Sequence, residues 1–342
     1  MVNILQIDYQ PDGNYAASGT GFFTRSDGII TTAAHVILKN GNAPQGVAEE
    51  LYVHVYPENV ILPATVIGVD RLYDVAVLKV NVGALPARSI LQWGDSRDTH
   101  VGDFAITIGQ PYGQHVQSVT FGVVRDNKFH DDSSIPESMV VDFHTVGGNS
   151  GGPVIDYEGN VIGILSWGLQ DVSAGYDFSL NGSISSHVAE QIYTYIVTQY
   201  DVSPMGPLVV YPTGFLGVEY SPVNTLILRQ QNITNLKVEG VFINSVRPSS
   251  PASVAGLVAG DIITTCNDVI VGHGNNQYPL GTLIHFQNPG GQVVLKIRRA
   301  TNYNLEVTLP PITLSTQPPT TDFIFSPLQS FQQRKMITTK LE

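Results

Sequence analysis

GGNSGGPVIDYEGNVIGIL, residues 147–165, places Ser150 inside a cluster of glycines and continues into a β-hairpin pattern. Two apolar runs flank the turn residues 157–160, a pattern typical of paired antiparallel strands. In α/β-hydrolases the G-x-S-x-G turn leads from a strand into a helix. Because a strand follows Ser150 here, the segment favours a β-rich fold over that class.

Short apolar runs separated by turns fill residues 1–200 around this segment. They are FFTRSDGIITT (22–32), LYVHVY (51–56), VAVLKV (75–80), DFAITIG (103–109) and SVTFGVV (118–124). No helical period separates them, so an antiparallel barrel or sandwich is expected. A single helix is predicted over about 184–199, where apolar residues recur on one face.

The chain divides into four parts by composition. We expect a first domain over 1–200, a linker over 201–207, a second domain over 208–312 and a disordered tail over 313–342. The linker contains the beginning of the Pro- and Gly-rich stretch SPMGPLVVYPTG, residues 203–214. The tail is rich in Thr, Gln, Ser and Pro. The second domain combines short strands with helices predicted within 247–261 and at 280–288.

Charge and hydropathy exclude several classes of protein. The 342 residues carry 17 Lys and Arg against 29 Asp and Glu, a net charge of −12, which argues against a basic nucleic-acid surface. Hydrophobic residues make up 42% and charged residues only 13%, so packed cores are expected. No run of about 18 apolar residues is present, and no membrane span is expected.

Cysteine usage and the first residues of the chain bear on location and cofactors. Cys266 is the only cysteine, so an internal disulfide and a cysteine-based zinc site are excluded. The start of the chain shows no signal-peptide pattern, and we expect a cytoplasmic or other reducing compartment. The sequence contains neither HExxH nor GxxxxGK[ST], so no metal and no cofactor is expected.

Three segments together supply the groups of a nucleophilic triad. They are TTAAHVI with His35, DRLYDVAVLKV with Asp74, and the glycine cluster with Ser150. A serine hydroxyl needs a base within hydrogen-bond reach, and that base needs a carboxylate to orient it. The order His, Asp, Ser is that of chymotrypsin-like proteases, whereas α/β-hydrolases have Ser, acid, His.

The glycines around the serine predict an oxyanion hole. Its segment is Gly148-Asn149-Ser150, and the N–H groups of Gly148 and Ser150 are the expected donors. Two amides can converge on one oxyanion only where the chain bends sharply, which glycine permits.

The sequence resembles trypsin-like serine peptidases, and among them the HtrA (DegP-like) peptidases with a PDZ domain. The resemblance is carried by SGTGFFTRSDGIITTAAHV, DVAVLKV, WGDSRDTHVGDFAITIGQPYG, GGNSGGPVID and GILSWG, which cover most of residues 17–180. In the second domain it is carried by FLGV, GVFINSVRPSSPASVAGLVAGDIITTCND and VVLKIRR. It implies a mostly β chain, with a chymotrypsin-like double β-barrel followed by a small α/β PDZ domain.

The resemblance also assigns function. It implies a serine endopeptidase that cleaves unfolded or extended polypeptides without a cofactor, with the substrate adding as a strand to Ser166-Trp167-Gly168. The PDZ domain would bind peptide C-termini, and their carboxylate would lie at Phe215-Leu216-Gly217-Val218, or it would regulate activity.

Three features depart from the family pattern. Asn149 replaces the Asp of secreted trypsins, so activation by zymogen cleavage is not expected. His144 would lie near the base of the specificity pocket and Asp177 near its wall, so the family's preference for small aliphatic residues need not hold. Only 18 residues precede Gly19, and formation of a homotrimer is left open.

Two hypotheses from different classes remain. In the first, the chain is a serine endopeptidase with a peptide-binding PDZ domain. In the second, the protease fold is latent and the chain is a peptide-binding scaffold or adaptor.

Overall fold

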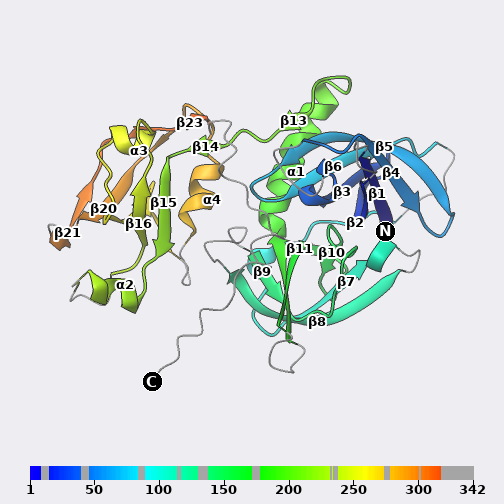
Figure 1. Cartoon of the computed structure of the whole chain (residues 1–342), viewed down its shortest axis with the longest axis horizontal. Coiled ribbons are helices and arrows are strands. Elements are labelled where there is room, and N and C mark those ends of the chain that lie inside the picture. Colours follow the sequence, from blue (N-terminus) through cyan, green and yellow to red (C-terminus); the bar gives the residue numbers. More distant parts are fainter. Residues whose placement is uncertain are drawn as a thin grey trace. The chain divides into compact units, whose positions relative to one another are not determined.

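The computed structural model describes residues 1–8, 15–39, 46–83, 89–113, 117–129, 138–171, 178–231, 233, 238–272, 278–299 and 302–316. In Figure 1 the described chain forms two compact units, the first ending at Tyr211 and the second beginning at Pro212.

Six strands of the first unit close into a barrel. They are β1 Val2–Asp8, β2 Tyr15–Arg25, β3 Ile29–Ala33, β4 Glu50–Val55, β5 Val60–Asp70 and β6 Val75–Val80. All neighbours pair antiparallel in the order β1-β2-β3-β6-β5-β4, and β4 returns to β1. Every residue of β3 is buried, and the short 3₁₀ helix η1 Ala34–Val36 follows it directly.

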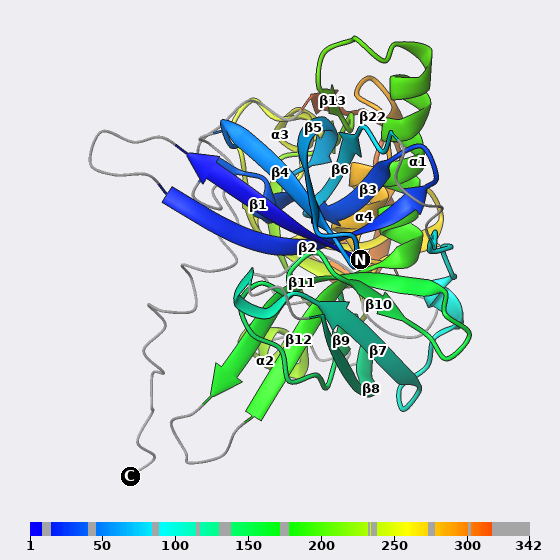
Figure 2. The same cartoon turned by 90° about the vertical axis from the view of Figure 1, so that its right-hand side faces the viewer.

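Six further strands close a second barrel, coloured teal to green in Figure 2. They are β7 Phe104–Gly109, β8 Ser118–Phe129, β9 Ser138–Val141, β10 Pro153–Ile155, β11 Val161–Asp171 and β12 Phe178–Ser185. Apolar side chains such as Met139, Phe143 and Val154 fill its interior. The 3₁₀ helices η4 Ser96–Asp98 and η5 Pro111–Gly113 lie before β7 and after it.

The first unit continues past residue 200. Helix α1 Ser186–Val202 confirms the predicted helix and buries Val188, Ile192 and Ile196. Strand β13 Val209–Val210 then pairs parallel with β5. The expected start of the second domain at 208 therefore differs from the structure, because two β-branched residues inside the Pro- and Gly-rich stretch extend the first sheet.

The second unit is a six-stranded sheet together with short helices and two small strand pairs. Its strands are β14 Gly214–Phe215, β15 Val218–Pro222, β16 Val241–Val246, β17 Ile262–Cys266, β18 Val269–Ile270, β19 Gln292–Val293, β20 Leu295–Arg299, β21 Asn302–Thr308, β22 Ile312–Thr313 and β23 Ser315–Thr316. Its helices are α2 Thr225–Gln230, α3 Pro251–Val254 and α4 Leu280–His285. In the sheet order β15-β16-β17-β20-β21, with β18 paired to β17 outside this order, strand β15 is an edge.

The second unit extends beyond the expected boundary at 312. Leu314 is buried in its core, and Ser315 and Thr316 pair with Phe215 and Gly214. Residues 313–316, expected in the tail, are thus part of the fold because Leu314 completes the apolar core. The rest of the expected tail, 317–342, lies outside the described residues.

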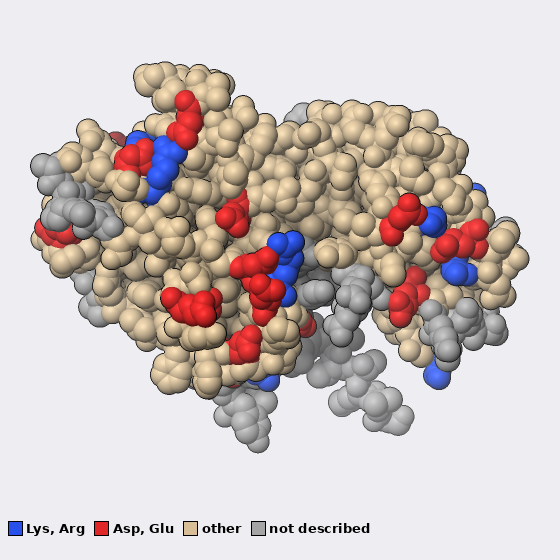
Figure 3. Space-filling view, turned by 180° about the vertical axis from the view of Figure 1, so that it is seen from behind, with Lys and Arg blue, Asp and Glu red and all other residues tan. Residues whose placement is uncertain are grey.

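The prediction of a mostly β chain with two β-barrels and a small second domain is confirmed. Charged side chains are sparse on the face shown in Figure 3, where acidic residues lie in small groups and only some of these groups lie beside basic residues. This agrees with the low charged fraction of the sequence.

Candidate active site

His35 and Asp74 form a paired unit at one end of the first barrel. Asp74 lies in the turn between β5 and β6 with a φ of 58°, in the left-handed region that Asp tolerates. Its Oδ1 accepts a hydrogen bond from the His35 backbone N–H at 2.7 Å, and its Oδ2 lies 2.7 Å from His35 Nδ1. Two contacts to one carboxylate fix both the backbone and the ring of His35.

The pair sets the protonation behaviour of His35. Burial lowers the pKa of His35, whereas the charge of Asp74 and the hydrogen bond to it raise that pKa. The effect of Asp74 is larger, so the net pKa is raised above the ordinary value of 6.5. An imidazole held in this way is a stronger base, and its cation is stabilised.

Ser166 completes the environment of Asp74. Its hydroxyl donates to Asp74 Oδ2 at 2.5 Å from a position where the register of β11 and β12 shifts. The sequence predicts Ser166 only as part of the substrate-binding strand. The structure turns its side chain toward Asp74 because the β-bulge re-aims this residue.

The Ser150 loop packs against the strands that lead to His35. The Thr20 N–H donates to the Ser150 carbonyl at 2.8 Å. A Cβ on Gly151 would overlap Thr32 Oγ1 and lie 3.0 Å from the Ala33 nitrogen, so only glycine allows this approach. Between the described residues Ser150 and His35 there is no side-chain hydrogen bond, a common feature of sites without substrate.

Hydrogen bonds around the loop orient the predicted oxyanion donors. The Gly147 carbonyl accepts from the Tyr112 N–H at 2.7 Å, and the Asn149 carbonyl accepts from the Gly152 N–H at 3.0 Å. In a trans peptide the N–H of the next residue points opposite to the carbonyl. The N–H groups of Gly148 and Ser150 therefore point away from these contacts, and neither has an acceptor within the described chain.

Asn149 differs from its two neighbours in this loop. Its N–H donates to the Val146 carbonyl at 3.2 Å and is not available to an oxyanion. Its side chain is buried, and a Cβ on Gly109 would overlap it. Asn149 thus anchors the loop, and two donors remain.

Thr20 is a residue of this site that sequence reasoning missed. Its hydroxyl donates to the Gly148 carbonyl at 2.7 Å and accepts from the Gln110 N–H at 3.0 Å. It is fully buried and joins β2 to the loop. The available signal was only a threonine between two glycines of this strand.

The free edge of β11 lies on the segment predicted to bind substrate. Gly163 and Ile164 pair with both β10 and β12, but Trp167 and Gly168 pair only with β12 among the described strands. Trp167 is mostly buried, and its ring occupies the space where Gly182 lacks a side chain. One edge of this segment is thus open to another strand.

Of the two residues predicted for the specificity pocket, His144 and Asp177, the structure describes only His144. His144 is exposed and follows the buried Phe143. The Phe143 carbonyl accepts a hydrogen bond from Asn181 Nδ2, and the Thr145 hydroxyl donates to Asn181 Oδ1. Asn181, which the sequence analysis did not single out, therefore holds the segment around His144. Asp177 lies outside the described residues.

The predicted carboxylate loop of the second unit turns at Gly217. The Leu216 carbonyl accepts from the Ala252 N–H and the Gly217 carbonyl from the Arg247 N–H, both at 2.9 Å. Gly217 has a φ of 88°, and a Cβ there would overlap Ser250 Cβ. The loop runs from Phe215 into Val218, the first residue of the edge strand β15.

Two features are absent from the described part of the chain. No three His, Cys, Asp or Glu side chains there are grouped to hold a metal ion. Among the same residues, no helix has the length and apolar character needed to cross a membrane.

Family models match both units. The model of the trypsin-like peptidase domain matches residues 19–164, and the model of the PDZ domain matches residues 214–309. The first match contains His35, Asp74 and Ser150, and the second contains the loop around Gly217.

The curated relatives share one name, and each matches most of this chain. A probable periplasmic serine endoprotease DegP-like of Chlamydia pneumoniae is 30% identical over 90% of this chain and 57% of its own length. The protein of the same name from Halomonas elongata is 32% identical over 85% of this chain and 56% of its length. The chain thus spans about half the length of the curated relatives it matches.

Solved structures share the fold of the described chain. An HtrA-type protease, AlgW, with a tripeptide has a TM-score of 0.70 at 22% identity and covers 93% of this chain and 94% of its own. The serine endoprotease from Yersinia pestis has a TM-score of 0.60 at 21% identity, covering 92% and 93%.

The expected cytoplasmic or reducing location is wrong. The relatives from Chlamydia and Halomonas are named periplasmic proteins, and the periplasm is an oxidising compartment. The inference failed because a chain whose only cysteine is Cys266 forms no internal disulfide in either kind of compartment. Cysteine count therefore could not distinguish the two.

The two domain models, the DegP-like relatives and the HtrA-type structures agree with the resemblance seen in the sequence motifs. The chain carries a trypsin-like peptidase domain and a PDZ domain, and it is similar to the HtrA (DegP-like) serine peptidases.

Proposed function

We propose that the chain is a serine endopeptidase in which Ser150 is the nucleophile, His35 the general base and acid, and Asp74 the orienting carboxylate. The observation that carries the proposal is the 2.7 Å contact of His35 Nδ1 with Asp74 beside a loop with two acceptor-free amides. This arrangement supplies the base, its support and the oxyanion donors of acyl transfer.

The reaction would proceed in two halves. Ser150 Oγ attacks the scissile carbonyl carbon while His35 Nε2 takes its proton, and the N–H groups of Gly148 and Ser150 bind the oxyanion. The C–N bond then breaks, and His35 returns the proton to the leaving amine. Water hydrolyses the acyl-enzyme by the same route, with His35 as base, and frees Ser150.

The substrate would be an extended or unfolded polypeptide. Its backbone would add to the open edge of β11 at Ser166, Trp167 and Gly168. The segment around His144, held by Asn181, would contact the side chain before the scissile bond. The AlgW structures with a tripeptide and with a decapeptide support peptide binding in this fold.

The second unit would bind peptide C-termini. Strand β15 is a free sheet edge, and the loop from Phe215 to Val218 precedes it. A peptide could pair with this edge and place its carboxylate at the loop amides.

Self-association would use an apolar ladder on the outer face of the second barrel. We define the apolar ladder as the cross-strand pairs Phe104–Val123, Ile106–Phe121 and Ile108–Val119 of β7 and β8. Phe104, Val119 and Phe121 are 64–76% exposed, and contiguous exposed apolar side chains mark association sites. A second copy of this chain would cover the ladder.

The alternative function is a latent, peptide-binding scaffold. The missing hydrogen bond between Ser150 and His35 is the observation that favours it. Under this alternative the nucleophile would stay unreactive.

Covalent labelling by a fluorophosphonate tests the proposal. Ser150 Oγ would attack phosphorus, fluoride would leave, and the proton would pass to His35. We expect one label per chain, mapped by mass spectrometry to Ser150, with none in Ser150→Ala. Ser26→Ala, in an exposed turn, is the matched control and should label fully. An unlabelled wild-type chain would support the scaffold.

A further inference from the structure

We infer that the guanidinium of Arg247 binds the C-terminal carboxylate of a peptide held by the second unit. The inference rests on the proposed peptide-binding function of that unit and adds a charged, specificity-determining group to it. The sequence motifs predict this role only for the loop from Phe215 to Val218.

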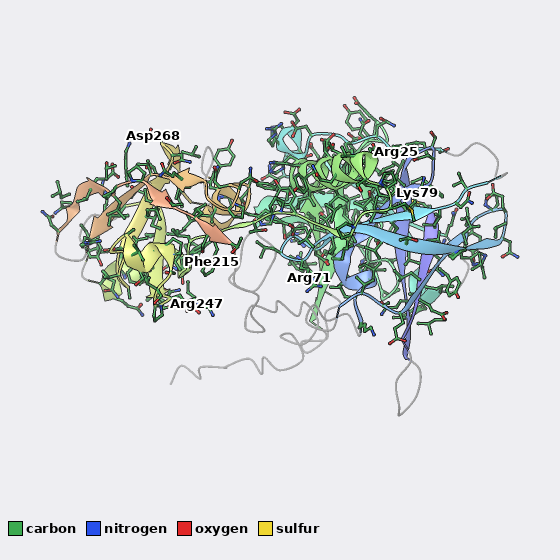
Figure 4. All side chains as sticks on the ribbon, turned by 90° about the horizontal axis from the view of Figure 1, so that it is seen from above. Arg25, Arg71, Lys79, Phe215, Arg247 and Asp268 are labelled. Atoms are coloured by element: carbon green, nitrogen blue, oxygen red, sulfur yellow. The ribbon has the colours of Figure 1, made fainter. Side chains whose placement is uncertain are left out.

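Arg247 lies directly against that loop. It follows the last residue of β16, and its backbone N–H donates to the Gly217 carbonyl at 2.9 Å. Its guanidinium carbon is 6.0 Å from the centre of the Phe215 ring, within the range of a cation–π contact. In Figure 4, Phe215 and Arg247 are labelled on the same side of the unit.

The Arg247 guanidinium lacks an anion in the described structure. Its Nη1 is buried and has no hydrogen-bond acceptor, and Arg247 forms no ion pair with any described residue. A buried charged donor without an acceptor is destabilising, so such groups usually have a partner. Here a bound ligand would provide it.

The loop amides point to the same kind of ligand. The Leu216 carbonyl accepts from the Ala252 N–H of α3, so the Gly217 N–H that follows it points the opposite way. The N–H groups of Leu216 and Gly217 have no acceptor within the described chain. Free amides and a guanidinium together match a planar carboxylate, which accepts several charge-assisted hydrogen bonds.

The neighbouring side chains favour a peptide terminus with an apolar last residue. Val218, Tyr220 and Leu283 are partly buried and pack on the core at β15 and α4. The Tyr220 hydroxyl accepts from the Gly281 N–H at 2.9 Å and so fixes α4 beside β15. An apolar side chain fits this surface, and the terminal carboxylate fits Arg247.

Peptide binding to the full chain tests this inference. The probes are a fluorescent mixture of random hexapeptides ending in Val, Leu or Phe with a free carboxylate, and the same mixture with amidated C-termini. We expect wild type to bind the free acids and Arg247→Gln to lose about 10-fold or more in affinity, the size of a charge-assisted hydrogen bond. Arg247→Lys should restore part of the loss.

Matched variants separate binding from folding. Arg229→Gln removes a charge from an exposed position of α2 and should bind like wild type. Arg247→Met should raise the thermal midpoint of the ligand-free chain while weakening binding, because it removes the unpaired buried nitrogen. A merely structural role for Arg247 would instead lower that midpoint.

The outcomes distinguish the role of Arg247 from carboxylate recognition by the second unit. If wild type prefers free acids and Arg247→Gln binds them equally well, the role of Arg247 is refuted while peptide binding stands. If wild type shows no preference for free acids over amides, carboxylate recognition by this unit is refuted together with the role of Arg247.

Discussion

Asp74 has the largest set of contacts of any residue proposed for the reaction. Its carboxylate meets the backbone and ring of His35 and the hydroxyl of Ser166. Asp74→Asn keeps the shape but stabilises the wrong tautomer of the ring, so kcat should fall by about 10⁴-fold. Steady-state peptide hydrolysis would measure this. If kcat falls by less than about 10-fold, Asp74 is not part of the mechanism.

The raised pKa of His35 predicts a pH profile. Catalysis needs the neutral ring, so kcat/KM should rise with pH through a midpoint above 6.5. Stability has the opposite sign, because protonated His35 stabilises the fold. That contribution is complete below about pH 6.5, the unfolded pKa, and is lost as pH rises through the folded pKa.

Asp74→Asn provides the control for the pH profile. Burial then acts without the carboxylate, so the pKa of His35 should fall below its ordinary value. Proton NMR of the ring would follow both chains. An unchanged midpoint in the variant would contradict the assigned cause.

At the scale of elements, the connection between β2 and the loop around Ser150 decides whether the oxyanion donors are in place. Thr20→Val keeps the side-chain shape and leaves the Gly148 carbonyl and the Gln110 N–H without their partner. We expect a loss of about 1–3 kcal/mol in unfolding free energy, and a slower fluorophosphonate reaction. Denaturation and labelling kinetics would measure the two effects.

Thr24→Val is the matched control for Thr20. Thr24 lies on the same strand, and its hydroxyl contacts Thr31 and Ile29, away from the loop. The Thr24→Val variant should react with the fluorophosphonate at the wild-type rate. Equal slowing in both variants would show a general effect of the strand and not of the loop.

Some elements of the fold were predictable from the sequence and others were not. The strands and the long helix were predictable because their apolar periods are local. Strand β13 was not, since its pairing with β5 depends on a residue range far away in the chain. The buried Leu314 escaped for the same reason, because its core contacts come from other strands.

In the candidate site, too, the residues within local motifs were predictable, and those that depend on distant segments were not. His35, Asp74 and Ser150 were named from motifs, and the structure places the first two in contact. Thr20 and Asn181 were missed because their hydrogen bonds join segments 128 and 38 residues apart. The turn of the Ser166 hydroxyl toward Asp74 depends on a bulge that no local pattern shows.

At the scale of the whole molecule, the apolar ladder predicts self-association. Phe104→Lys together with Phe121→Lys places two like charges on its exposed positions, so the assembly should dissociate. Light scattering coupled to size exclusion would give the mass of both chains. Tyr157→Lys, at another exposed aromatic position, is the control and should leave the mass unchanged. A monomeric wild type would contradict self-association through the ladder.

Cleavage of unfolded casein by the full chain is the most direct test of the proposed activity. Wild type should produce fragments, and Ser150→Ala should produce none while retaining its folded circular dichroism spectrum. The new termini would show which residues precede the scissile bond. Fragments of equal yield from Ser150→Ala, or none from a wild type whose folding is verified, would contradict a serine endopeptidase.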